Sequence, residues 1–163
     1  MITECYPLED TPLFAEMFKH RGDQFVSRLK WNIGVDESGA ERDQFDDDLA
    51  AYLIQHEGDR HLASMRYRWM ITPTLVSDVF PQFQEFVYPD AHGIEVTRFC
   101  AAPGGTFDGT ELMRVGREHA RSIGGEVLYG IFTPAMPRIY RRFGWETEVL
   151  AKDGNIWFGA WIV

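Results

Sequence analysis

The sequence predicts an α/β fold in which helices lie on both faces of a mixed central sheet. Two Thr-Pro pairs, at positions 11–12 and 133–134, place a capping hydroxyl before a proline, a pattern that begins helices. The largely apolar run E-V-L-Y-G-I-F at 126–132 is typical of an interior strand. The order of elements is strand, helix, three strands with a helical insert, helix, strand, helix and two strands. This order predicts a three-layer sandwich.

The first half of the chain has a helix from Thr11 to about Arg28 after its first strand. One face of this helix carries, at spacings of three and four, Phe14, Phe18, Arg21 and Phe25. A guanidinium in line with three rings needs either a compensating anion or access to water. Segments 49–56 and 61–70 predict an antiparallel hairpin, and a short helical piece at 78–86 leads to a strand at 93–100.

The second half alternates helices with strands. A helix from about Asp108 to Ile123 ends at Gly124-Gly125, and a strand follows at 126–132. The helix that begins at Thr133 ends near Gly144, and strands at 145–150 and 155–163 close the chain.

Length and composition indicate one folded domain over residues 1–163. The chain is 45% hydrophobic and 14% aromatic, and it has no apolar run of membrane-span length. The N-terminus is acidic, unlike a secretory signal, and Cys5 and Cys100 make neither a disulfide framework nor a metal-ligand pattern. These features predict a cytoplasmic protein with no membrane partner.

Charge is unevenly distributed along the chain. The net charge of −9 argues against nucleic-acid binding, which needs an excess of basic residues. Residues 36–48 hold seven acids and one arginine, whereas residues 111–142 hold six arginines and three glutamates. Arginine suits planar recognition of carboxylates and phosphates, so one region is expected to face an anionic ligand.

Eight spaced polar and aromatic positions resemble the signature of the acyl-homoserine lactone synthases, the LuxI-type autoinducer synthases with a GNAT-like fold. They are Arg21, Phe25, Trp31, Asp43, Asp46, Arg66, Glu95 and Arg98. The resemblance runs from about Leu13 to Trp145 and includes the glycine-containing segment 101–120. Thr97 stands where the family has serine, and W-M-I-T-P-T replaces its proline-threonine stretch. The second departure leaves Arg66 and Arg68 as alternatives, with Arg66 favoured by its spacing from D-V-F-P.

The resemblance implies a reaction between S-adenosylmethionine and an acyl thioester. The acyl group comes from acyl carrier protein or coenzyme A, and the products are an N-acyl-homoserine lactone and 5′-methylthioadenosine. S-Adenosylmethionine is then a substrate, and no tightly bound cofactor or metal is expected. Two rivals stay open: an N-acetyltransferase that uses acetyl-coenzyme A, and a non-catalytic remnant that binds S-adenosylmethionine or carrier protein.

The resemblance also implies roles at the substrate. Asp43 and Asp46 are expected to hold the ammonium, although their spacing beside adjacent acids, taken alone, favours a solvated loop. Arg21 and Arg66 suit anions, and Phe25 with Trp31 is expected to form the adenosine wall unless these rings are ordinary core. Glu95 is the expected general base, and Asp46 and Arg98 complete the catalytic set. Strict strand alternation places Glu95 and Arg98 on opposite faces unless a bulge intervenes.

The acyl donor is expected to meet the second half of the chain. A solvated helix face explains its arginines as well as donor docking does, and the docking candidates are Arg114, Arg117, Arg138, Arg141 and Arg142. Thr133 and Met136 correspond to the family's acyl pocket, and their simpler roles are a helix cap and a core residue.

Overall fold

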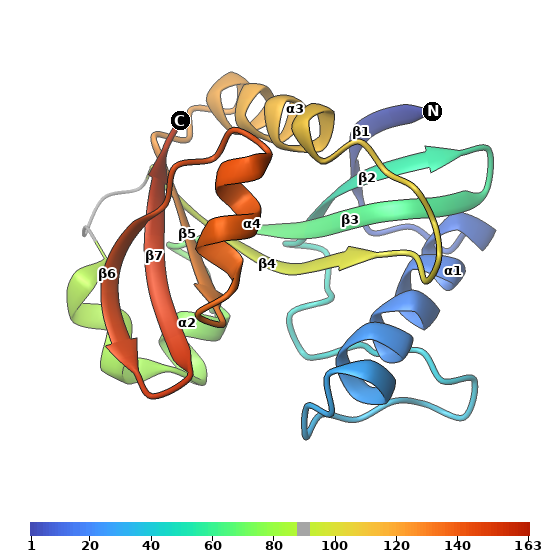
Figure 1. The fold of residues 1–163 in the computed structure, drawn as a ribbon, viewed down its shortest axis with the longest axis horizontal. Coiled ribbons are helices and arrows are strands. Elements are labelled where there is room, and N and C mark those ends of the chain that lie inside the picture. The colour runs from blue at the N-terminus through green and yellow to red at the C-terminus, as the bar shows by residue number, and fades with distance from the viewer. Residues whose placement is uncertain (88–91) are drawn as a thin grey trace. The chain divides into compact units, whose positions relative to one another are not determined.

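The fold is described by a computed structural model that covers residues 1–87 and 92–163. Seven strands form one sheet in the order β1-β2-β3-β4-β5-β7-β6 (Figure 1). The strands are β1 (Ile2–Pro7), β2 (Ala51–Glu57), β3 (Arg60–Trp69), β4 (Gly93–Ala101), β5 (Val127–Phe132), β6 (Glu148–Asp153) and β7 (Ile156–Ile162). The helices are α1 (Pro12–Arg21), the π-helix η1 (Gly22–Arg28), α2 (Leu75–Asp78), the 3₁₀-helix η2 (Pro81–Phe86), α3 (Gly109–Ser122) and α4 (Met136–Arg142).

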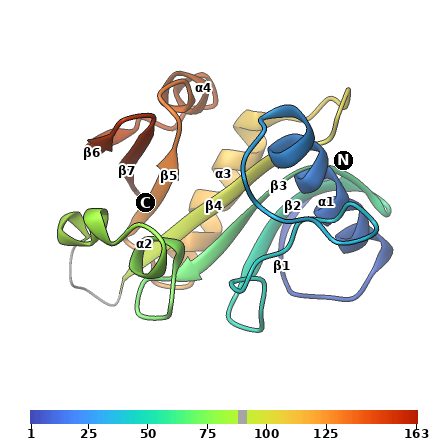
Figure 2. The same ribbon diagram turned by 90° about the horizontal axis from the view of Figure 1, so that it is seen from below.

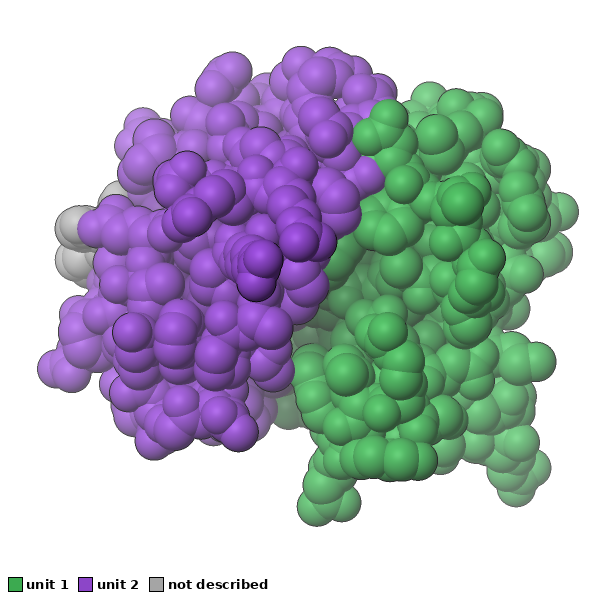
Figure 3. All heavy atoms as spheres, in the orientation of Figure 1, with its two compact units in different colours: residues 1–66, 98–108 green, residues 67–97, 109–163 purple. Residues whose placement is uncertain are grey.

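The chain divides into two compact units (Figure 3). Unit 1 comprises residues 1–66 and 98–108, and unit 2 comprises residues 67–97 and 109–163. Strands β3 and β4 contribute residues to both units, so the boundary runs through the sheet rather than through a linker. The single domain expected over residues 1–163 stays a prediction.

In unit 1, α1 packs on one face of the antiparallel pair formed by β1 and β2 (Figure 2). Strands β1 and β2 are antiparallel, with Thr3 opposite Gln55. The core between α1 and β2 consists of Leu13, Phe14, Met17, Phe18, Ala40, Ala50, Tyr52 and Ile54. The stripe predicted on the first helix is therefore the face that the helix buries.

Unit 2 carries helices on both faces of its strands. Strands β4 and β5 are parallel, whereas β5 and β6 each pair with β7 in antiparallel fashion. One face packs against α2 and η2 through Val76, Phe83, Tyr129 and Phe158. The opposite face packs against α4, where the Tyr140 and Trp161 rings lie 5.1 Å apart. The predicted mixed α/β sheet with helices on both faces is confirmed in this unit.

Two helices differ from the sequence prediction. The first helix changes from α1 to the π-helix η1 at Gly22, where a Cβ atom would lie 2.0 Å from the Gly39 carbonyl oxygen. Glycine is required there because a loop distant in sequence presses against the helix. The last helix begins at Met136 rather than Thr133, because the Thr133 carbonyl accepts the Met136 N–H in a preceding turn.

Strand β4 departs from regular alternation at Arg98. The φ angle of this residue is +58°, in the left-handed region that non-glycine residues rarely occupy. The backbone of β4 is therefore irregular at Arg98, so strict alternation does not extend from Glu95 to this residue.

Candidate functional site

Six charged side chains of unit 1 form a buried ion-pair network. They come from the end of α1, the loop before β2, and strands β3 and β4, and they are Arg21, Glu41, Asp43, Asp46, Arg66 and Arg98. Three guanidinium groups therefore face three carboxylates, so the network carries no net charge. Such pairing is what allows charges to remain ionised away from water.

Arg21 joins two acids from the aromatic face of the first helix. Its Nε donates to Glu41 Oε2 at 2.6 Å, and Nη1 and Nη2 donate to the two Asp46 oxygens at 2.9 Å each. Burial lowers the pKa of Arg21, but the Asp46 charge and its hydrogen bonds outweigh burial and raise the pKa above its ordinary value. Arg21 is thus a buried cation with two partners, not one that reaches water.

Asp46 is enclosed by donors on both oxygens. Besides Arg21, it accepts from the Tyr52 hydroxyl at 2.8 Å and from the Asp43 N–H at 2.8 Å, and Arg66 Nη1 lies 2.9 Å from Oδ1. Burial raises the pKa of Asp46, but the charge of Arg21 and its hydrogen bonds lower the pKa by more. The pKa therefore lies well below its usual range. With 1% of its side chain exposed, Asp46 is a structural centre of the network.

Arg66 holds both predicted aspartates. It donates from Nη1 and Nη2 to the two Asp43 oxygens at 2.6 and 3.1 Å, and it also pairs with Asp46. Arg68, the alternative strand arginine, lies in unit 2 and donates from Nε to the Pro73 carbonyl. Of the two arginines, Arg66 is the one that contacts the aspartates.

Asp43 and Arg98 are the members of the network that reach the surface. Their side chains are 15% and 8% exposed, whereas the other four are at most 1% exposed. Arg98 Nη2 donates to Asp43 Oδ2 at 2.7 Å and to Glu41 Oε1 at 3.0 Å. Adjacent surface groups of opposite charge can recognise the ammonium and the carboxylate of one amino-acid ligand.

The two predicted wall aromatics stack on each other. The Phe25 and Trp31 rings lie 4.7 Å apart with an interplanar angle of 6°, and Arg98 Cζ lies 5.8 Å from the Phe25 ring centre. Phe25 is 2% exposed and Trp31 is 38% exposed. Phe25 is therefore covered, and only Trp31 offers a ring surface to a ligand.

Glu95 lies in unit 2 and accepts backbone hydrogen bonds at the start of α2. Its oxygens accept from the Leu75 N–H at 3.1 Å and the Val76 N–H at 2.8 Å. Glu95 is 1% exposed. Hydrogen bonds of this kind favour the ionised carboxylate.

Sequence reasoning missed two members of this arrangement, Glu41 and Tyr52. Glu41 joins Arg21 to Arg98, and the Tyr52 hydroxyl donates to Asp46. The sequence signal for Glu41 was its position two residues before Asp43, within the segment 36–48 that contains seven acids. That segment offers no reason to prefer one acid over another until the loop is folded.

The predicted donor-docking arginines of unit 2 have different environments. Arg114 pairs with Glu111 and Glu118 on its own helix, and Arg141 lies 3.3 Å from Glu146. Arg138 and Arg142 are exposed. Arg117 is half-buried, and its Nε has no hydrogen-bond partner within residues 1–87 and 92–163.

The predicted acyl-pocket residues lie at the end of β5. The Thr133 carbonyl accepts the Met136 N–H at 3.0 Å, and both side chains are half-buried. Next to them, Phe132 contacts the rings of Tyr140 and Trp161. Thr133 therefore lies just after β5, Met136 is the first residue of α4, and the acyl role of both stays a prediction.

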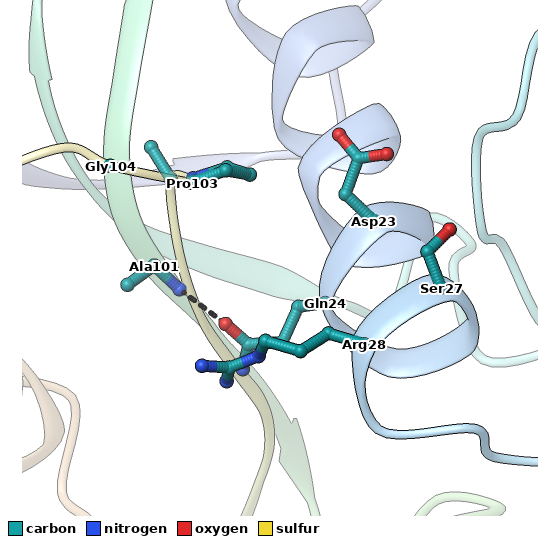
Figure 4. Close-up of a pocket in the computed structure, with 8 residues that line it drawn as sticks. Asp23, Gln24, Ser27, Arg28, Ala101, Pro103 and Gly104 are labelled. Carbon is teal, nitrogen blue, oxygen red and sulfur yellow. Dashed lines mark hydrogen bonds between the residues drawn. The ribbon is translucent and has the colours of Figure 1, made fainter.

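A pocket of about 540 Å³ lies within unit 1 beside η1. It is lined by Asp23, Gln24, Ser27, Arg28, Ala101, Ala102, Pro103 and Gly104 (Figure 4). Gln24 fixes the helix to the end of β4, because its amide donates to the Phe99 carbonyl at 3.0 Å and accepts from the Ala101 N–H at 3.1 Å. None of the eight signature residues lines this pocket.

Two further features of the described ranges bear on function. No helix in residues 1–87 or 92–163 combines the length and apolarity needed to cross a membrane. Over the same residues, no three His, Cys, Asp or Glu side chains are grouped as metal ligands would be.

Comparison with known proteins identifies the family. A family model described as "Autoinducer synthase" matches residues 5–156. The acyl-homoserine-lactone synthase of Pectobacterium parmentieri is 31% identical over 156 residues, which cover 90% of this chain and 71% of that protein. The crystal structure of TofI in a ternary complex with an inhibitor and MTA is 25% identical, has a TM-score of 0.80, and is matched over 99% of this chain and 91% of its own.

The fold is shared more widely than the family. An acyl-CoA N-acyltransferase from Pseudomonas aeruginosa aligns with a TM-score of 0.67 at 14% identity, over 98% of this chain and 97% of its own. That likeness concerns the fold alone and agrees with the expected GNAT-like architecture. Together with the buried network of unit 1, the family match establishes that this chain belongs to the autoinducer synthase family.

Proposed function

We propose that this protein is an acyltransferase that makes an N-acyl-homoserine lactone from S-adenosylmethionine and an acyl thioester. Its relatives are named acyl-homoserine-lactone synthases, and the TofI complex contains MTA, the abbreviation of the methylthioadenosine product. The observation that carries the proposal is the buried network with Asp43 and Arg98 at its surface. This arrangement offers one charge for each end of an amino-acid substrate.

The reaction has two bond-forming steps. The substrate ammonium first loses a proton to a base, and the free amine attacks the thioester carbonyl. A C–N bond forms, the C–S bond breaks, and a second proton passes from the nitrogen to the departing sulfur, which leaves as the donor thiol. The substrate carboxylate then attacks its own γ-carbon, where a C–O bond forms as the bond to the sulfonium breaks. The second step needs no proton transfer because the negative carboxylate and the positive sulfonium neutralise each other.

The network residues divide into contacting and positioning groups. Asp43 binds the ammonium and Arg98 binds the carboxylate, because their side chains are the ones that reach the surface. Arg66 holds Asp43 and Glu41 holds Arg98 from the interior. Arg21 pairs with both Glu41 and Asp46 beneath them. Glu95 stays the predicted general base, and within unit 2 its oxygens accept hydrogen bonds from the Leu75 and Val76 N–H groups.

The acyl donor is expected to bind at arginines of unit 2. The exposed arginines Arg138 and Arg142 are suited to an acidic carrier protein or to coenzyme A phosphates. Arg114 is less available because two glutamates of its own helix already hold it. An acyl pocket at Thr133 and Met136, a cytoplasmic location and the lack of a tightly bound cofactor also stay predictions.

Mass spectrometry after incubation with S-adenosylmethionine and a panel of acyl thioesters tests the proposed reaction. The expected result is equal amounts of methylthioadenosine and N-acyl-homoserine lactone with one or a few donors. An N-acetyltransferase would leave S-adenosylmethionine intact and acylate another amine. A non-catalytic remnant would give no product with any carrier-protein or coenzyme A donor, and either result would overturn the proposal.

A further inference from the structure

The predicted base Glu95 is held by the start of the short helix α2. Glu95 Oε2 accepts the Leu75 N–H at 3.1 Å, and Oε1 accepts the Val76 N–H at 2.8 Å. The next N–H along the helix, that of Ser77, donates to the Thr74 hydroxyl at 3.2 Å. The first N–H groups of a helix have no acceptor inside the helix. Glu95 and Thr74 therefore divide these donors between them.

Thr74 and Ser77 cap α2 reciprocally. The Thr74 hydroxyl accepts the Ser77 N–H, and the Ser77 hydroxyl accepts the Thr74 N–H at 2.9 Å, which completes a capping box. Thr74 is 0% exposed. Helix α2 has only four residues, Leu75–Asp78, and a helix of that length is not stable by itself. The direction of its first N–H groups therefore depends on the cap.

Arg68 fixes the residue before the cap. Its Nε donates to the Pro73 carbonyl at 3.0 Å, and Arg68 is buried. Pro73 and Thr74 end the W-M-I-T-P-T stretch at 69–74, where the chain departs from the family pattern. The stretch that differs from the family thus contains the cap of α2, and Arg68 of the same unit holds this stretch.

We propose that Thr74 and Arg68 are positioning residues for Glu95 in the reaction proposed above. Thr74 directs two backbone N–H groups at the carboxylate, and Arg68 holds the carbonyl that precedes the cap. Hydrogen bonds from N–H groups favour the ionised carboxylate, which is the form that can accept a proton. The inference rests on the proposed function, and it adds the residues that keep its predicted base in the working form.

Steady-state kinetics of Thr74→Val and Thr74→Ser test the role of the hydroxyl. Valine has the shape of threonine but leaves the Ser77 N–H without its acceptor, whereas serine keeps the acceptor. Thr74→Val should lower kcat about tenfold and leave KM for S-adenosylmethionine within about twofold, and Thr74→Ser should restore kcat to within about twofold. If Thr74→Val does not fold, Ser77→Ala opens the same capping box and should lower kcat about threefold. Wild-type kcat in the folded cap variant, or equal losses in Thr74→Val and Thr74→Ser, would overturn the inference.

The pH profile separates positioning from a general loss of structure. Loosening hydrogen bonds to a carboxylate favours its protonated form, so the acid limb of kcat/KM in Thr74→Val should move to higher pH by about one unit. The matched control is Thr72→Val, which removes a hydroxyl of the same stretch that donates to the Trp69 carbonyl at 2.7 Å. Its acid limb should stay that of wild type. A shift in both variants, or in neither, would overturn the proposal.

Arg68→Lys tests the second positioning residue. Lysine keeps the charge but does not reproduce the planar guanidinium and its Nε donor, so kcat should fall about threefold. Combined with Thr74→Val, the fall should be smaller than the product of the two single effects, because both residues act through the same N–H groups. A fall equal to the product would contradict a role of Arg68 through the cap.

Hydrogen exchange at the Leu75 and Val76 amides gives a readout that needs no turnover. Thr74→Val should speed exchange at both amides at least about fivefold, whereas Thr72→Val should leave them within about twofold of wild type. A protein that shows this pattern but makes no lactone keeps the positioning inference and loses the proposed reaction. Lactone synthesis with wild-type kcat and pH profile in Thr74→Val keeps the reaction and loses the inference.

Discussion

Unit 1 and unit 2 fill their interiors with different chemistry. Beside α1 in unit 1 lies the six-residue charge network, while under α4 in unit 2 lies a cluster of rings formed by Phe132, Tyr140, Trp145 and Trp161. All four rings are buried, as are the network members other than Asp43 and Arg98. The ring cluster gains stability directly from apolar burial, whereas the charges must first repay the loss of their hydration.

The contrast between a charged and an aromatic interior indicates that the two interiors have different roles. An apolar cluster of similar volume would serve unit 1 at least as well if stability were its only requirement. The network instead sets the positions of Asp43 and Arg98, which the interior arginines and acids hold from below. We infer that unit 1 keeps a charged interior because its surface has to bind a charged substrate.

Breaking the network is expected to have the largest effect on stability. Asp46→Asn leaves Arg21 and Arg66 without their shared charge, and removing one partner of a buried ion pair destabilises proteins by about 3–5 kcal/mol. Denaturant unfolding of this variant measures the loss. The matched control is Asp48→Asn, an exposed acid of the same segment. A loss under about 1 kcal/mol would mean that the network is not the centre of unit 1.

Truncating a ring in the interior of unit 2 is expected to cost the same stability at every pH. Trp161→Ala removes a ring that contacts Phe132, Tyr140 and Trp145, which predicts a loss of about 3–5 kcal/mol. Because no ionised group takes part, this loss should be the same at pH 5 and pH 8. A pH-dependent loss would remove the contrast drawn between the two interiors.

Acid is expected to weaken unit 1 through His61 before it titrates the network. Burial, followed by the charges of His20 and His56, lowers the pKa of His61 to about 3. A histidine in the unfolded chain has a pKa of about 6.5. Between the folded and unfolded pKa values, His61 is therefore protonated in the unfolded chain and neutral in the folded chain. The stability from neutral His61 is complete above pH 6.5 and falls as the pH drops towards 3, by about 2 kcal/mol at pH 5.

Unfolding of wild type and His61→Gln between pH 8 and pH 4 measures this effect. The wild-type slope in this window should flatten in the variant. Asp46 belongs to a lower window, because its lowered pKa gives stability that is lost only as the pH falls below its unfolded value near 3.8. An unchanged slope would show that another group controls the window from pH 6.5 to 4.

The smallest expected effect is that of Tyr52→Phe. The substitution keeps the ring in the α1 core and removes one donor to Asp46, a hydrogen bond of 2.8 Å. A hydrogen bond to a charged group predicts a loss of about 1.5 kcal/mol. Lactone synthesis should fall a few-fold, since Asp46 still has both arginines. A loss as large as that of Asp46→Asn would show that the hydroxyl and not the ion pairs organises the network.

Much of the fold follows from local sequence patterns. The strand lengths, the hairpin between β2 and β3, and the glycine stop after α3 agree with prediction within a few residues. The change to the π-helix η1 at Gly22 was not predicted. The close approach of Gly39 to Gly22 is a contact between distant segments, which local patterns do not indicate. The start of α4 also differs, since a Thr-Pro pair is compatible with a turn as well as a helix cap.

The site could be predicted only in part, because local patterns in the sequence do not show contacts between distant segments. Arg21 stood out because a charge lay on an aromatic stripe, and it is indeed held by acids. Glu41 and Tyr52 carry no such anomaly, and Phe25 gives no sign that Trp31 covers it. The pocket beside η1 depends on the π-helix and on the end of β4, so no pattern along the chain indicates it.

Turnover of Asp43→Asn tests the central claim, that the network exists to present Asp43 and Arg98 to S-adenosylmethionine. Methylthioadenosine release is measured per folded molecule, with folding checked by circular dichroism. The account predicts a fall of at least about 100-fold, because the ammonium loses its counter-charge while the interior pairs of Asp46 remain. Release within about threefold of wild type would contradict the account.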